Sequence, residues 1–174
     1  MTQSVPDFID QLTSVRSSAV HLEMRDAYGV ADEADDYASW LAGGERDTDP
    51  ASPYWSAWVQ IISELTARGV RVRRARIVSE PVSDYIRYEH AGTVVNLAAG
   101  EEVRWLPRKQ ASTLFLPGND FWLLDGKLVR FGHFSGHGEY LGETFTDEPS
   151  VAALCADAFE SVWTLAVPHE KFPV

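Results

Sequence analysis

Arginine side chains crowd into one short apolar segment of this chain, VRVRRARIV at residues 70–78. The alternation of residue types predicts a strand, with Arg74 and Arg76 on the same side. Arg104, in the apolar segment EVRWLP at 102–107, would lie beside them at one edge of a sheet. Because guanidinium groups bind phosphate or carboxylate through paired hydrogen bonds, these arginines predict a site for a small anionic ligand. Alternatively, they pair with acidic residues of the chain: Glu80, Asp84, Glu89, Glu101 or the acidic helices.

A polar segment, SEPVSDY at 79–85, follows the basic strand directly. In α/β proteins the loops at the carboxyl ends of strands line the ligand crevice. We therefore predict ligand-binding roles for Glu80, Ser83, Asp84 and Tyr85. In the alternative interpretation Ser83 caps a helix and Glu80 holds the loop.

Two histidines and a carboxylate, His133, His137 and Glu139, surround one predicted hairpin turn. Their nitrogen and oxygen atoms are donors that zinc accepts, so they are candidate metal ligands. Spacing across a turn does not fix the direction of side chains, and short motifs of this kind have low specificity. Two solvent-facing histidines are the simpler interpretation, and we expect neither a metal nor another cofactor.

The 174 residues carry a formal net charge of −11, unevenly spread. Residues 68–109 hold 9 Lys or Arg against 5 Asp or Glu, whereas residues 1–67 hold 3 against 12. Direct binding to duplex DNA is not expected of a chain with a pI near 4.8. The first residues lack the features of a secretory signal, and no apolar run approaches the roughly 20 residues of a membrane helix. We therefore expect a cytoplasmic protein.

Hydrophobic periodicity predicts an α/β fold, with α+β possible, in which helices flank a mixed sheet. Three helices are predicted: Asp7 to about Arg25, Ala31 to Leu41, and a third between Ser52 and Gly69. Strands are predicted at 70–78, 102–107, 120–125, 127–134 and 139–146, with shorter helical segments at 83–90 and 96–100 and a long helix over 151–163. We expect one domain over 1–174, with a helical part at 1–68, a core at 69–167 and a tail at 168–174 that leaves the fold.

Four segments carry a family resemblance: SEPVSDYIRYEH, EEVRWLPR, PGNDFWLLDG and TDEPSVAALCADAFESVWTLAVPHEKF. Together they resemble an uncharacterised family of actinobacterial proteins, whose members are often encoded beside helix-turn-helix regulators. The similarity covers nearly the whole chain. No activity is known for that family. The resemblance therefore implies a genomic neighbourhood beside regulators, but no particular reaction.

Residues 69–167 also resemble, more distantly, the phospholipase D-like fold. The signature of that superfamily is His, any residue, Lys, four residues, Asp; the His is the nucleophile and the Lys holds a phosphate oxygen. Matching its Asp to Asp125 puts Gly118 at the His position and Asp120 at the Lys position. Besides Asp125, only Gly132 keeps the pattern. Since glycine has no nucleophile and a carboxylate repels phosphate, the resemblance implies a domain that has lost this phosphodiester chemistry.

These observations favour a non-catalytic regulatory or adaptor protein that binds a small anionic ligand or a transcription-regulator partner through residues 71–109. The resemblance implies a helix-turn-helix partner, because the sequence shows no such motif of its own. One alternative is a hydrolase, metal-assisted through His133, His137 and Glu139. Another is an acidic decoy for a basic DNA-binding protein, using the negative charge of residues 1–67. A homo-oligomer is compatible with each.

Overall fold

The computed structural model describes residues 7–29 and 33–174. Within them, seven strands form one sheet in the order β6-β5-β4-β1-β2-β3-β7. The central strands β1, β2 and β3 are parallel, whereas β4, β5, β6 and β7 each pair antiparallel with a neighbour. The strands are β1 (Ser18–Glu23), β2 (Arg71–Val78), β3 (Glu102–Pro107), β4 (Phe121–Leu124), β5 (Leu128–Phe134), β6 (Tyr140–Thr146) and β7 (Val167–Pro168).

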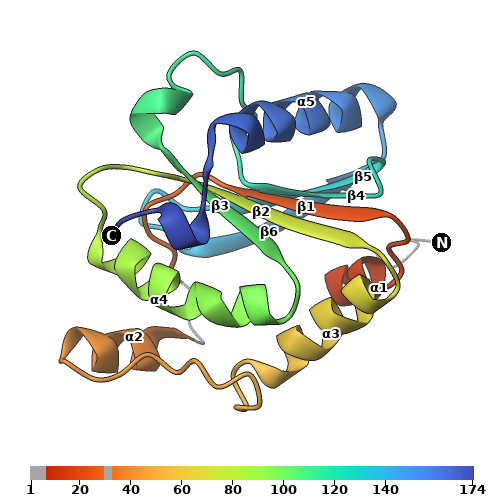
Figure 1. Ribbon diagram of the computed structural model, residues 1–174. Coiled ribbons are helices and arrows are strands. Elements are labelled where there is room, and N and C mark those ends of the chain that lie inside the picture. The colour runs from red at the N-terminus through yellow and green to blue at the C-terminus, as the bar shows by residue number, and fades with distance from the viewer. Residues whose placement is uncertain (1–6, 30–32) are drawn as a thin grey trace.

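Helices cover both faces of this mixed sheet, which confirms the predicted α/β class (Figure 1). In Figure 1, α5 lies above the sheet, α1, α3 and α4 lie below it, and α2 is outermost beneath α4. The elements are α1 (Phe8–Thr13), α2 (Ala34–Leu41), α3 (Ser56–Ala67), α4 (Asp84–Ala98), α5 (Pro149–Leu165) and the 3-10 turns η2 (Arg108–Ala111) and η3 (His169–Lys171).

Alternation along the strands sends neighbouring residues to opposite faces of the sheet. On β1, Val20 and Leu22 join the apolar cluster that packs against Phe159 of α5. On the other face, Ala19 packs with apolar residues of α3, and His21 stacks on Trp122 of β4. The face under α5 is therefore mainly apolar, apart from Arg73 and Arg104, whereas the face towards α3 and α4 carries a network of polar groups.

Three sequence predictions about the elements were wrong. The first helix ends at Thr13, and residues 18–23 form the central strand β1, because pairing with β2 and β4 outweighs the helical spacing of the apolar residues. Residues 84–98 form one continuous helix where two shorter segments were expected. Residues 168–174 do not leave the fold: β7 pairs with β3, and Phe172 is buried against Trp105. The start of the second predicted helix, at Ala31, lies outside the described residues.

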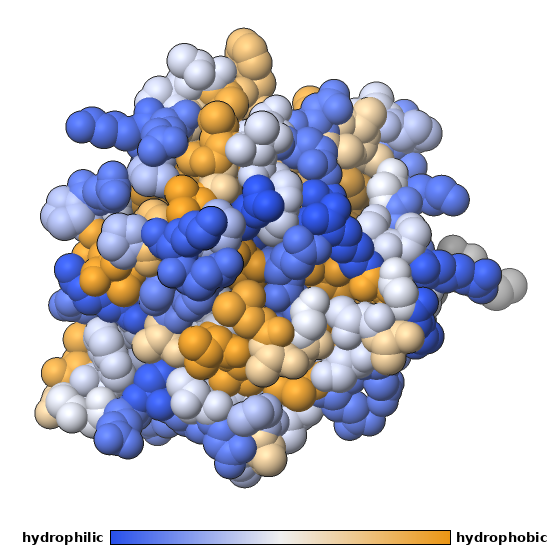
Figure 2. Space-filling view, in the orientation of Figure 1, coloured by the Kyte–Doolittle hydropathy of each residue, from blue (hydrophilic) through white to orange (hydrophobic). Residues whose placement is uncertain are grey.

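The surface seen in Figure 2 is a mosaic of hydrophilic residues with smaller hydrophobic areas between them. The large exposed apolar side chains come from separate elements, among them Leu41 of α2, Phe115 in the loop before β4, Leu141 of β6 and Leu154 of α5. Across 7–29 and 33–174, no helix is both long and apolar enough to span a bilayer.

Candidate functional site

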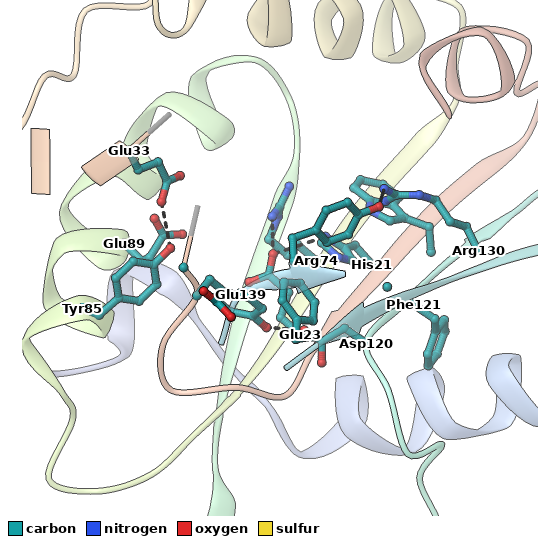
Figure 3. A pocket seen from close by; sticks show the side chains of 16 residues that line it. His21, Glu23, Glu33, Arg74, Tyr85, Glu89, Asp120, Phe121, Arg130 and Glu139 are labelled. Atoms are coloured by element: carbon teal, nitrogen blue, oxygen red, sulfur yellow. Dashed lines mark hydrogen bonds and ion pairs between the residues drawn. The ribbon is translucent and has the colours of Figure 1, made fainter. Parts of the chain in front are cut away.

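The sheet face towards α4 is hollowed into two adjoining cavities of about 670 Å³ and 420 Å³. Both volumes fall in the range of small-molecule sites, roughly 300–1,000 Å³. In Figure 3, side chains of the central strands lie between Arg130 on one side and Tyr85 on the other. The residues that line both cavities are His21, Glu33, Arg74, Glu89 and Trp122.

Arg74 and Arg76 share this face of β2 as predicted, but their charges are already compensated. Arg74 Nη1 lies 2.5 Å from Glu23 Oε1, and its Nε lies 2.6 Å from Glu101 Oε1. Arg76 Nε lies 2.9 Å from Glu23 Oε2, and its Nη1 lies 2.8 Å from Glu89 Oε2. The structure therefore favours the alternative in which the arginines pair with acids of the chain, among them Glu89 and Glu101, over the prediction that they bind an anionic ligand.

The strand register explains why these charges meet. In the parallel pair of β1 and β2, His21 lies opposite Arg74 and Glu23 opposite Arg76. Burial alone would raise the pKa of Glu23, but Arg76 and Arg74 outweigh that effect and lower it to about 2. Glu23 is therefore ionised at neutral pH, and each of its oxygens faces one arginine.

His21 stands at the centre of the cavity floor. Its ring stacks on Trp122 with centroids 4.3 Å apart, and its Nδ1 lies 3.3 Å from Glu23 Oε1. Burial lowers the pKa of His21 well below its usual value, and the nearby Arg74 acts in the same direction. At neutral pH this is an uncharged imidazole, which can accept a hydrogen bond from a ligand.

Asp120 forms the acidic end of the larger cavity. Its Oδ1 accepts a hydrogen bond from the backbone N–H of Met24 at 2.9 Å, and its Oδ2 accepts one from the hydroxyl of Tyr28. Asp120 is 6% exposed. Burial, reinforced by the charge of Glu23, raises its pKa from 3.8 to about 6. Among the described residues, no Lys, Arg or His forms an ion pair with this carboxylate.

Glu33 stands at the opposite side of the cavity, immediately before α2. Its two carboxylate oxygens accept hydrogen bonds from the hydroxyls of Tyr54, at 2.7 Å, and Tyr85, at 2.8 Å. Burial raises the pKa of Tyr85, and the charges of Glu89 and Glu33 add to the effect. Tyr85, predicted as a binding residue, thus lines the cavity as a neutral hydrogen-bonding group.

The other predicted binding residues lie away from this cavity. Arg104 was wrongly placed beside Arg74: it is paired in register with Ala75, and it donates to the carbonyl of Trp163 on the α5 face. Ser83 caps α4 by accepting a hydrogen bond from the backbone N–H of Ile86, as the alternative interpretation held. The remaining two are Glu80, beside a separate surface hollow, and Asp84, exposed and paired with Arg87.

The candidate metal ligands do not converge. His133 Nε2 lies 2.9 Å from Thr144 Oγ1 of β6, and His137 is exposed in the turn. Glu139 lines the larger cavity. Within the described part of the chain, no group of three or more His, Cys, Asp or Glu is placed to hold a metal ion.

This chain is similar to a known protein family and to solved structures. A family model described as "Domain of unknown function (DUF6879)" matches residues 6–173. The chain belongs to this family. A phospholipase D family member, Nuc from Salmonella typhimurium, superposes with a TM-score of 0.50 at 11% identity, over 92% of this chain and 86% of that one. NucT from Helicobacter pylori superposes with a TM-score of 0.53 at 15% identity, over 92% and 87%. The search of curated proteins gave no match.

These likenesses confirm a phospholipase D-like fold for this DUF6879 member. The residues that the sequence match assigns to the signature are placed by the structure as follows. Asp120, which the sequence match assigns to the Lys position, lines the larger cavity, and Gly118, which it assigns to the His position, borders a smaller hollow together with Asp120. A Cβ at Gly118 would meet no atom within 4 Å, so its position is open. Gly132, which matches the signature in sequence, lines the larger cavity.

Asp125, the acid that the sequence match assigns to the signature, has a structural role at the far end of β4. Its Oδ1 accepts hydrogen bonds from the backbone N–H of Ser17 at 2.7 Å and from the hydroxyl of the same residue at 2.8 Å. The backbone N–H of Arg16 and that of Ser18 donate to the same carboxylate. Asp125 therefore holds the connection that leads into β1. The hairpin of β4 and β5 keeps its scaffold, as expected from the sequence.

Sequence reasoning missed the residues that β1 and its following loop contribute. His21 and Glu23 were hidden inside a predicted helix, and Tyr28 falls in the loop after that strand. The alternation of Ala19, His21 and Glu23 with two apolar residues was the available signal. Glu33 carried no such signal, because its position depends on Tyr54 and Tyr85.

Proposed function

We propose that this chain is a non-catalytic ligand-binding protein with a regulatory or adaptor role, and that its ligand occupies the cavity between β1, β2, α4 and β5. The supporting observation is that the carboxylate of Asp120 faces a cavity of about 670 Å³. In the sequence match, this residue takes the place of the phosphate-holding lysine of the phospholipase D signature. Gly118 supplies no nucleophile at the other signature position.

The architecture of the cavity suits binding. Glu23, Arg74 and Arg76 hold one another, so the floor keeps its shape before a ligand arrives. Preorganised polar groups of this kind reduce the ordering cost of association. His21 and Tyr85 add groups that can exchange hydrogen bonds with a ligand.

A regulatory output would pass through a partner protein. The helix-turn-helix regulator implied by the family resemblance stays a prediction, as does a homo-oligomer. The acidic-decoy alternative has less support, because two acids of the N-terminal part, Glu23 and Glu33, face the cavity.

A thermal-shift screen with a chemically diverse small-molecule library tests the proposal. Some compounds should raise the melting temperature of the wild-type protein and lose that effect in Gly132→Leu. A Cβ at Gly132 would approach only the ring of Phe134, at 3.4 Å, so the larger side chain can extend into the cavity without backbone clashes. The matched control is Gly136→Leu, in an exposed turn where a Cβ meets no atom within 4 Å, and it should respond like the wild type.

Two results would contradict the proposal. One is a set of compounds that stabilise the wild type and Gly132→Leu equally. The other is hydrolysis of bis(p-nitrophenyl) phosphate by the wild type that disappears in His21→Ala, which would make the histidine of the cavity floor a catalytic residue.

A further inference from the structure

The charges that line the larger cavity do not balance. Its lining includes two arginines, Arg74 and Arg130, and both are engaged: Arg74 by Glu23 and Glu101, Arg130 by Glu143. The lining includes five acids: Glu23, Glu33, Glu89, Asp120 and Glu139. The cavity therefore has more acidic than basic groups, and an anion entering it would meet repulsion.

Three of the five acids face the cavity without an ion-pair partner. Within the described residues, no ion pair involves Glu33, Asp120 or Glu139. Asp120 is the most costly of the three, because an ionised carboxylate that is 6% exposed has lost most of its hydration. Arg25, which borders a neighbouring hollow together with Asp120, lowers the pKa of Asp120 without forming an ion pair with it, but burial still raises that pKa to about 6. A second positive charge, on the cavity side, would compensate the remaining loss.

Aromatic rings form the walls around Asp120. The rings of Tyr28 and Phe134 meet edge to face with centroids 5.2 Å apart, and Phe134 contacts the ring of Tyr140 at 5.6 Å. All three rings line the cavity, and the hydroxyl of Tyr28 donates to Asp120. The guanidinium of Arg25, outside the cavity lining, already lies over the Phe134 ring at 5.3 Å from its centroid. Aromatic faces attract cations, most strongly where water is excluded.

The protein already holds an organic cation in this way beside the second cavity. The guanidinium of Arg46 lies over the rings of Tyr88, Tyr54 and Trp55, at 3.9, 5.0 and 5.2 Å from their centroids. Tyr54 and Trp55 line the second cavity. Gly92 makes room for this packing, because a Cβ there would lie 3.0 Å from Arg46 Nε. Aromatic rings beside the second cavity therefore hold a partly buried cation.

We infer that the ligand of this cavity is an organic cation, a protonated amine or a guanidine on an apolar body, whose charge lies beside Asp120 and whose body contacts the rings of Tyr28, Phe134 and Tyr140. This inference rests on the proposed function and names the ligand class for the same site. It replaces the anionic ligand expected from the sequence, because the arginines behind that expectation are already paired.

Three probes with one indole body test the charge of the ligand: tryptamine as the cation, tryptophol as the neutral analogue and indole-3-acetate as the anion. In isothermal titration calorimetry at pH 7.5, tryptamine should bind about tenfold or more tightly than tryptophol, equivalent to about 1.4 kcal/mol, and indole-3-acetate most weakly. Asp120→Asn should weaken tryptamine about tenfold and leave tryptophol unchanged. The control Asp157→Asn, exposed on α5 at the opposite face, removes the same charge and should change no affinity.

The pH dependence provides a second readout. Because the pKa of Asp120 is about 6, tryptamine affinity should fall as the pH is lowered through that value, while tryptophol affinity stays constant. Equal binding of the three probes, or tighter binding of indole-3-acetate, would overturn the cationic assignment; if Gly132→Leu still abolished that binding, the proposed function would stand. Absence of tryptamine binding at millimolar concentration would also overturn the assignment, whereas the library screen decides the proposed function separately.

Discussion

The two faces of the sheet are built from the same strands but use alternate residues for different purposes. Under α5, Val20 and Leu22 of β1 join an apolar core with Phe159. On the opposite face, the intervening residues His21 and Glu23 belong to an ion network around a cavity. Burial of apolar area on the first face stabilises the fold, whereas burial of charged groups on the second face costs part of that stability. We therefore expect substitutions on the α5 face to change stability through apolar burial, and substitutions on the cavity face to change it through charge.

The largest loss of stability is expected on the α5 face. Phe159 is fully buried, stacks on Trp163 and lies under the guanidinium of Arg73. Phe159→Ala should lower the free energy of unfolding by about 4 kcal/mol, through lost burial and the cavity left behind. Urea denaturation monitored by circular dichroism measures this. A loss below about 1 kcal/mol, the size of a conservative core change, would mean that the α5 face is not the main core.

Breaking the ion network of Glu23, Arg74 and Arg76 should lower the free energy of unfolding somewhat less than Phe159→Ala does. Glu23→Gln should lower the free energy of unfolding by about 3 kcal/mol at pH 7, because Arg74 and Arg76 lose a buried counter-charge. The control Glu102→Gln breaks an exposed pair with Arg71 and should cost about 1 kcal/mol or less. Urea denaturation of both variants measures the contrast.

The pH dependence of the stability of Glu23→Gln provides a further test of the buried ion pairs. The pKa of Glu23 is lowered from 4.5 to about 2 in the folded protein. Its contribution to stability is therefore fully present above pH 4.5 and is lost as the pH falls towards 2. The difference between the wild type and Glu23→Gln should shrink over that interval. A difference that stays constant would show that the ion pairs do not stabilise the fold.

The smallest of these effects should be a gain in stability, expected when the carboxylate of Asp120 is replaced. The folded protein raises the pKa of Asp120 from 3.8 to about 6, so it binds a proton more tightly than the unfolded chain. Stability then decreases as the pH rises from 3.8 to 6, and the ionised carboxylate remains unfavourable above that range. Asp120→Asn keeps an acceptor for the N–H of Met24 but loses the acceptor of the Tyr28 hydroxyl, which costs about 1–2 kcal/mol. Because the rise in pKa corresponds to about 3 kcal/mol, the variant should be about 1–2 kcal/mol more stable at pH 7.5.

Thermal denaturation of Asp120→Asn between pH 3.5 and 7.5 tests this sign. The advantage of the variant should vanish near pH 3.5, where both chains carry a neutral group at this position. Destabilisation at pH 7.5 would mean that Asp120 serves the fold and not a ligand.

Local signals were sufficient for much of the fold. The strand at 71–78, the meander of β4, β5 and β6, and the helix at 149–165 follow from short-range alternation, turn residues and helical periodicity. β1 could not be recognised in the same way, because its partners are Arg71 to Arg76 and Phe121 to Leu124, far away in the chain. A central strand depends on those distant pairings more than on its own sequence.

The site was predictable only in part for the same reason. Arg74 and Tyr85 were identified from their own segments, and both line the cavity. Arg104 was misplaced because the relative register of β2 and β3, which puts it opposite Ala75, is invisible in either strand alone. The charge of the cavity could not be anticipated without Glu23, since β1 places that residue between Arg74 and Arg76.

A histidine-selective NMR titration tests the central claim most directly, because His21 lines the cavity while His169 is buried elsewhere beside Trp105. The compounds to titrate are those that stabilise the wild-type protein in the thermal-shift screen. The account predicts that they shift the ring resonances of His21, leave those of His169 unchanged, and lose this effect in Gly132→Leu. Ligands that leave His21 unchanged while they shift His133 or His137 would contradict it, because the binding site would then lie at the hairpin turn.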